Sequence, residues 1–138
     1  MHPEKLKLIQ MWMTKASRDL IMADRAMSAP PTLPDYAAFH CQQAAEKARK
    51  GFLAWQDQPL KRTHDLPELI ADCVGINADF LDLKLAAQRL NPYSTRISYP
   101  DDPDPSADEA IEFIHLAWQI TEFVSQRLPP EVHDAVIR

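Results

Sequence analysis

Apolar residues recur every three or four positions in one segment after another of this chain, and prolines separate the segments. Such spacing places the apolar side chains on one face of an α-helix. The first repeat predicts a helix over residues 4–29, which ends at Pro30 and Pro31 because proline cannot continue a helix. Its members are Leu6, Ile9, Met13, Ala16, Leu20, Ala23 and Met27.

The second helical segment runs from about Asp35 to residue 56 or 57 and has small side chains on its apolar face. Asp35, which follows Pro34, is a suitable N-cap because its carboxylate can accept a hydrogen bond from the first turn. The apolar face comprises Ala37, Ala38, Cys41, Ala44, Ala45, Ala48, Phe52 and Trp55. Small residues allow close contact, so we expect a neighbouring helix to pack tightly against this face.

Capping patterns mark the start of two later helices. Asp65 and Glu68 open a short helix that we expect to end at Gly75. Ser106 and Glu109 open a last helix that continues to about residue 128. Its inward positions are Ile114, Ala117, Thr121, Val124 and Leu128.

Between these two helices we expect another over residues 78–90, with Leu81, Leu85 and Leu90 among its apolar positions. The loop that follows, residues 91–105, is long for a compact bundle. No segment shows the alternation of a strand, so the sequence predicts an all-α, up-and-down bundle of four to five helices.

Length and composition suit one soluble domain. The chain has 138 residues, of which 46% are hydrophobic and 25% charged. We expect a helical domain over residues 1–128 and a short C-terminal tail over residues 129–138, because Pro129 and Pro130 follow the last helix. Cys41 and Cys73 lack a metal or redox spacing and are most simply buried, reduced thiols.

The sequence also limits where the protein works and what it binds. No apolar run reaches the roughly 20 residues of a membrane span, and the first residues lack the apolar core of a signal peptide. We therefore expect a cytoplasmic protein without membrane contact. The formal net charge of -5 makes non-specific nucleic-acid binding unexpected, since such binding requires clustered Lys and Arg.

Three hydrogen-bonding side chains lie on one edge of the second helix. His40, Gln43 and Lys47 stand at positions i, i+3 and i+7, so they can point in one direction beside the apolar face. An imidazole, an amide and an ammonium in a row suit an anion. The arrangement therefore suggests a phosphate site.

This segment, residues 39–50, reads Phe-His-Cys-Gln-Gln-Ala-Ala-Glu-Lys-Ala-Arg-Lys and closely resembles the signature helix of the HEPN family. Residues 63–69, Thr-His-Asp-Leu-Pro-Glu-Leu, resemble the His-Asp-Leu motif with which that family begins a following helix. Residues 91–100 are similar to its Arg-Tyr-Pro loop, although Ile97 and Ser98 separate Arg96 from Tyr99 and Pro100. The resemblance covers roughly residues 15–128.

The resemblance implies a helical bundle and a function in binding. It implies a non-catalytic domain that binds a nucleotide, a partner nucleotidyltransferase, or both, as one member of a toxin–antitoxin-like pair. His40, Gln43, Lys47 and Arg96 would contact phosphate, and Tyr99 would lie near the base. No cofactor is implied. One alternative is an RNase toxin with a degenerate site around Arg96; another is a dimeric helical scaffold without a small-molecule ligand.

Some HEPN proteins are ribonucleases with an Arg, four to six residues and then a His. Arg127 and His133 have this spacing, but Pro129 and Pro130 intervene, and we interpret the match as chance. Arg96 has no His within the next ten residues and so lacks a base. We therefore assign no catalytic residue.

No metal site is expected either. The candidate ligands show no His-x-x-x-His or Cys-x-x-Cys spacing. They are His40, Cys41, His64, Cys73 and His115.

Each candidate also has a structural interpretation. His40 could bond a backbone group or Glu46 beside the core, and Lys47 could simply neighbour Gln43 on a solvated face. Arg96 could pair with the acidic residues of its loop. Tyr99 could pack that loop onto the bundle.

Three large side chains in a row point to a second apolar surface. Met11, Trp12 and Met13 cannot all enter the core from one helix, because successive residues are about 100° apart. A homodimer is the simplest use of such a surface.

Overall fold

The computed structural model describes residues 1–59, 62–63, 65–93 and 104–133. In chain order its elements are α1 (Pro3–Ser28), α2 (Pro34–Trp55), α3 (Leu66–Ile76), the 3₁₀-helix η1 (Ala78–Leu83), α4 (Lys84–Leu90), the 3₁₀-helix η2 (Asn91–Tyr93), α5 (Ala107–Arg127) and α6 (Pro130–His133). Every element in the described residues is helical, which confirms the all-α prediction.

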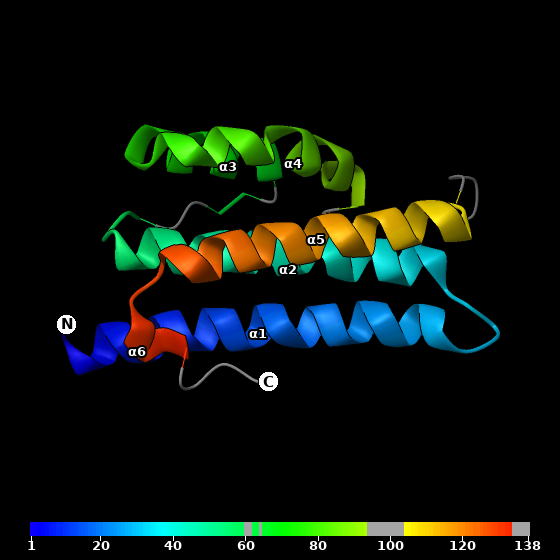
Figure 1. The fold of residues 1–138 in the computed structure, drawn as a ribbon, viewed down its shortest axis with the longest axis horizontal. Coiled ribbons are helices and arrows are strands. Elements are labelled where there is room, and N and C mark those ends of the chain that lie inside the picture. Colours follow the sequence, from blue (N-terminus) through cyan, green and yellow to red (C-terminus); the bar gives the residue numbers. More distant parts are fainter. Residues whose placement is uncertain (60–61, 64, 94–103, 134–138) are drawn as a thin grey trace.

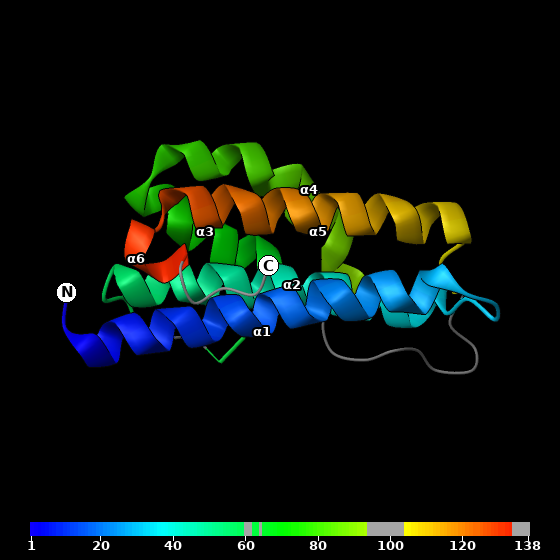
Figure 2. The same cartoon turned by 60° about the horizontal axis from the view of Figure 1, so that its bottom comes forward.

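Helix α2 lies at the centre of the bundle and packs against α1, α3 and α5. Helices α1 and α2 form a long antiparallel pair, and α5 runs along both of them (Figure 1). The shorter helices α3 and α4 form a layer on the side of α2 that faces away from α1, as Figure 2 also shows. Any side chain on α2 is therefore close to at least one other element.

The apolar repeat of α1 and the small-residue face of α2 meet as the sequence predicts. Ile9, Met13, Ala16, Leu20 and Ala23 are buried, and so are all of the predicted α2 positions except the half-buried Trp55. At Gly51 a Cβ atom would lie 3.3 Å from the Cβ of Trp12. The backbones of α1 and α2 thus approach too closely there for a larger side chain to fit without movement.

The predicted N-cap of α2 is wrong by two residues. The helix begins at Pro34 with Leu33 as N-cap, and Leu33 makes no side-chain capping bond. Proline suits the first helical position because its fixed φ is helical and its missing N–H would have no partner there. Asp35 instead lies in the first turn, where its charge complements the helix dipole.

Helix α3 begins as predicted and continues past its predicted end. The Asp65 carboxylate accepts a hydrogen bond of 3.2 Å from the Glu68 backbone N–H. The helix then includes Gly75 and ends at Ile76, with Asn77 as C-cap. The Asn91 side chain accepts a hydrogen bond of 2.9 Å from the Leu66 N–H, so η2 helps to fix the start of α3.

The single α-helix predicted over residues 78–90 is a 3₁₀-helix followed by an α-helix. A 3₁₀-helix has three residues per turn, so the side chains leave the α-helical register. Phe80 and Leu83 are fully buried, whereas Leu81 and Leu85 are 58% and 75% exposed. The prediction that Leu81 and Leu85 belong to the apolar face is therefore wrong.

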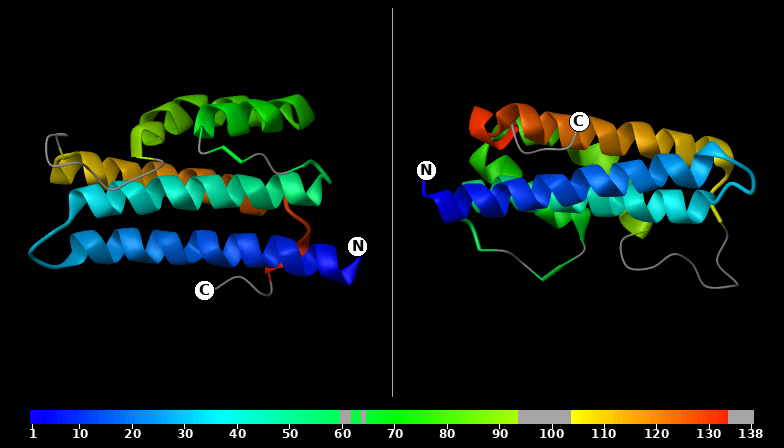
Figure 3. Two further views of the ribbon diagram at one scale, coloured as in Figure 1. Left: turned by 180° about the vertical axis from the view of Figure 1, so that it is seen from behind. Right: turned by 90° about the horizontal axis from the view of Figure 1, so that it is seen from below.

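Helix α5 has the predicted capping box between Ser106 and Glu109. After it, residues 130–133 form α6, whose Val132 is buried. The Gln10 side chain donates a hydrogen bond of 3.2 Å to the Glu131 carbonyl, and Figure 3 shows α6 beside the N-terminal half of α1. The start of the predicted tail is thus attached to the bundle.

None of the helices in the described residues is long and apolar enough to span a membrane.

Candidate functional site

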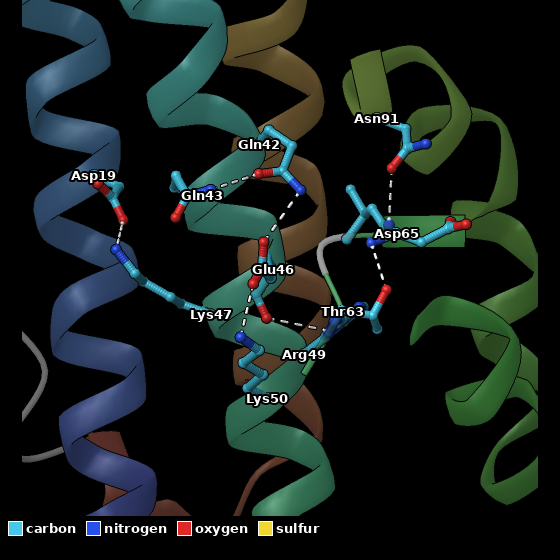
Figure 4. A network of polar contacts seen from close by, with 11 residues as sticks. Asp19, Gln42, Gln43, Glu46, Lys47, Arg49, Lys50, Thr63, Asp65 and Asn91 are labelled. Carbon is cyan, nitrogen blue, oxygen red and sulfur yellow. Dashed lines mark hydrogen bonds and ion pairs between the residues drawn. The ribbon is translucent and has the colours of Figure 1, made fainter. Parts of the chain in front are cut away.

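The side chains of His40 and Lys47 converge on Asp19 of α1. The His40 Nδ1 lies 2.9 Å from one Asp19 carboxylate oxygen, and the Lys47 Nζ lies 2.5 Å from the other (Figure 4 shows the Lys47 contact). Asp19 is nearly buried, whereas the His40 and Lys47 side chains are partly exposed. The predicted phosphate edge therefore already holds an anion that belongs to the protein.

Sequence reasoning did not single out Asp19. Its position in the sequence could have indicated it, because Asp19 is three residues after Ala16 and four before Ala23 and so lies on the inner side of α1. A carboxylate at the edge of an apolar repeat needs a partner on the facing helix. His40 and Lys47 were the available partners.

Gln43, the third predicted member of this edge, turns away from the other two. Its amide donates a hydrogen bond of 2.9 Å to the side-chain oxygen of Gln42. Gln43 thereby joins a second polar group on α2 rather than His40 and Lys47.

That second group consists of Gln42, Glu46 and Arg49, all buried and spaced at i, i+4 and i+7. The Glu46 carboxylate accepts a hydrogen bond of 3.3 Å from the Gln42 amide and forms an ion pair of 2.7 Å with Lys50 (Figure 4). Arg49 donates a hydrogen bond of 3.3 Å to the Glu46 backbone carbonyl. We refer to these three residues as the buried polar cluster.

Arg49 is the least satisfied member of the buried polar cluster. It is fully buried, and its Nε and Nη2 atoms have no hydrogen-bond partner among the residues that the structure describes. Burial lowers the pKa of Arg49 to about 10, and the nearby Cys73, Glu46 and Asp72 partly offset this effect. Arg49 is thus still cationic near neutral pH, and the Glu46 carboxylate is one of the groups that favour the charged form.

Both cysteines are buried and reduced. Burial raises the pKa of Cys41 to about 12 and that of Cys73 to about 11, the latter despite the opposing effect of Arg49. Both thiols are therefore protonated near neutral pH and unreactive as nucleophiles.

Arg127 and His133 point to different parts of the bundle. The Arg127 Nη1 donates a hydrogen bond of 3.0 Å to the Phe123 carbonyl, and its Nη2 lies 3.5 Å from Asp79 of η1. His133 belongs to α6, which packs against α1. Arg96, Tyr99 and His64 lie outside the described residues. Across the described part of the chain, no three His, Cys, Asp or Glu side chains are grouped to hold a metal ion.

The signature helix and the bundle around it can now be compared with known proteins. A family model described as the HEPN domain matches residues 9–128, which is most of the chain. The chain belongs to the HEPN domain family. No curated protein matches the sequence of this HEPN chain.

Two solved structures share this HEPN fold. ST0689, described as an archaeal HEPN homologue, is 28% identical over 86% of this chain and 96% of its own, with a TM-score of 0.71. TT1696 from Thermus thermophilus is 31% identical over 87% of this chain and 98% of its own, with a TM-score of 0.72. Both matches cover more than four fifths of this chain.

Proposed function

We propose that this HEPN chain is a non-catalytic, cytoplasmic binding domain. It forms a homodimer and docks a small nucleotidyltransferase, as one member of a toxin–antitoxin-like pair. The observation that carries the proposal is a set of large apolar side chains on the outer side of α1. We call Leu8, Met11 and Met22 the outer strip; their exposures lie between 36% and 49%.

The outer strip is separate from the face that α1 uses within the bundle. Met13 is buried against α2, whereas Met11, two residues earlier, is half exposed. Ile111 and Trp118 of α5, which also packs against α1, are similarly exposed. Clustered exposed apolar residues are typical of protein interfaces, because association removes them from water.

Charge supports a protein partner beyond a second copy. Lys15 and Arg18 are exposed on α1 between Met11 and Met22, so the middle of the outer strip is cationic. A partner with acidic groups around an apolar patch would complement it and avoid burying unpaired charge. The prokaryotic HEPN pairing with a nucleotidyltransferase supplies the class of partner.

Met11→Lys tests the interface. An ammonium in the apolar contact, on the same face as Lys15 and Arg18, is expected to convert the dimer to a monomer, because a further charge of the same sign would be buried without a partner. The measurement is mass by light scattering after size-exclusion chromatography, alone and with a co-expressed nucleotidyltransferase of the same genome. Leu85→Lys is the matched control, since Leu85 is even more exposed but lies on α4. Equal behaviour of the two variants would refute the outer strip as the interface.

Nucleotide binding is the second candidate function. It is favoured by the convergence of His40 and Lys47 at a partly exposed edge between two helices. The proposed contacts are His40, Gln43, Lys47 and Arg96 for phosphate and Tyr99 for the base. Because the Asp19 carboxylate already contacts His40 and Lys47, a phosphate at this edge would have to displace that carboxylate.

Competition by Asp19 makes the location testable. If phosphate binds at this edge, Asp19→Asn should tighten binding about tenfold, whereas Lys47→Ala should abolish it, because the first change removes a competing anion and the second removes a ligand contact. Isothermal titration with ATP, GTP and their monophosphates measures both effects, beside an RNA-cleavage assay for the alternative of a degenerate RNase. If neither substitution changes the nucleotide affinity, this edge is excluded as the nucleotide site.

A further inference from the structure

One cavity lined by described residues lies away from the Asp19 edge. It has a volume of about 480 Å³, which falls within the range of small-molecule sites. It is formed where α2 and α5 end and where α3 turns into η1, and Figure 1 shows these three places at the same end of the bundle. Its walls are Phe52, Trp55, Gln56, Ile76, Asn77, Ala78 and Arg127. We call it the end pocket.

A continuous row of π systems supports two walls of the end pocket. The Trp55 ring packs edge-on against Phe52 at a centroid distance of 5.8 Å, and Phe52 lies 4.5 Å from Phe80. Phe80 in turn packs edge-on against Phe123 at 5.0 Å. The Arg127 guanidinium lies 3.3 Å from the centroid of Phe123. Trp55 is therefore held against the buried ring of Phe52, and Arg127 against the partly buried ring of Phe123.

Among the described residues that line the end pocket, Arg127 is the only cation. Stacking on Phe123 and the hydrogen bond to the Phe123 carbonyl fix its position. Its contact with the carboxylate of the largely exposed Asp79 is long at 3.5 Å. A guanidinium held in this way retains donors for an anionic group of a ligand.

Two amides complete the end pocket. The Asn77 side-chain oxygen accepts a hydrogen bond of 3.0 Å from the Asp79 N–H, which fixes the side chain and leaves its NH₂ group as a donor. Gln56 is anchored through its backbone, whose N–H donates to the Phe52 carbonyl at 3.1 Å. Asn and Gln amides are the side chains that read the hydrogen-bonding edges of planar bases.

We propose that the end pocket binds a planar, hydrogen-bonding ring that carries an anionic group, of the nucleoside monophosphate class. The ring stacks on Trp55, the amides of Gln56 and Asn77 contact its edge, and Arg127 binds the phosphate. Stacking of a base on an aromatic side chain and a charge-assisted contact from arginine each strengthen binding several-fold or more. The inference extends the second candidate function and gives it a different location, so either can fail alone.

The test is isothermal titration of the full-length protein with AMP and GMP, and with indole-3-acetate as a ring with a carboxylate but no base edge. Arg127→Gln and Trp55→Leu are each expected to weaken AMP binding about tenfold or more, and Trp55→Phe to retain it within a few-fold. Equal binding of indole-3-acetate would overturn the role given to the two amides and with it the nucleotide class.

Arg89→Gln is the matched control. Arg89 also packs on a phenylalanine ring, Phe113 at 5.2 Å, and also pairs with a carboxylate, but it does not line the end pocket. The Arg89→Gln variant should bind AMP with the same affinity as the unaltered protein. Binding lost in Lys47→Ala but kept in Arg127→Gln would overturn the end pocket and leave nucleotide binding at the Asp19 edge. No saturable binding of any probe would overturn both.

Discussion

Glu46→Ala is expected to destabilise the protein by about 3–5 kcal/mol, because it leaves the guanidinium of Arg49 buried without a compensating charge. Glu46 is 2% exposed, and its carboxylate accepts a hydrogen bond from Gln42 and pairs with Lys50, so two further polar side chains depend on it. Urea denaturation followed by circular dichroism measures the loss as a lower midpoint. The effect should exceed that of any substitution on the solvated surface.

Substitution of Arg49, the cationic member of the buried polar cluster, should have a different effect on stability. Two nitrogen atoms of Arg49 have no hydrogen-bond partner within the described part of the chain, so Arg49→Met removes a poorly compensated charge and keeps most of the volume. Replacing a buried ion by an apolar side chain of similar size is often neutral or stabilising by about 1–4 kcal/mol. A large loss of stability in Arg49→Met would show that the guanidinium is better compensated than its contacts indicate.

Glu112→Ala is the surface control for Glu46→Ala. Glu112 forms a two-pronged ion pair with Arg89 at 3.0 and 3.1 Å, but both side chains are about half exposed. Exposed ion pairs contribute at most about 1 kcal/mol because water screens them. If Glu112→Ala cost as much as Glu46→Ala, burial would not be the cause of the larger effect.

The elements predicted correctly from the sequence are those whose signals are local. Helices α1 and α5 are long and amphipathic, so a shift of one residue would move many apolar side chains at once. The Asp65 cap and the Ser106–Glu109 capping box depend on neighbours three residues apart, which a sequence displays directly. The sequence of the HEPN signature helix also displays directly the small residues with which α2 packs against α1.

The features that the sequence did not reveal depend on contacts between distant segments. Asp19 meets His40 and Lys47 only because α1 and α2 pair in one register, and 21 residues separate Asp19 from His40. Glu46 and Arg49 break the apolar pattern of a buried face, and their burial follows from the position of α2 at the centre of the bundle. Likewise, the end pocket gathers the ends of three helices that are far apart in the chain.

Substitutions in η1 distinguish the observed register from the one expected of a continuous α-helix. Phe80→Ala is expected to cost about 3–5 kcal/mol, since Phe80 is fully buried and packs between the rings of Phe52 and Phe123. Leu81→Ala, one residue later and more than half exposed, should change stability by less than about 0.5 kcal/mol. Thermal and urea denaturation of the two variants give the comparison. An α-helix with Leu81 on its apolar face would make Leu81→Ala costly, so similar losses in both variants would contradict the 3₁₀ register that carries Phe80 into the core.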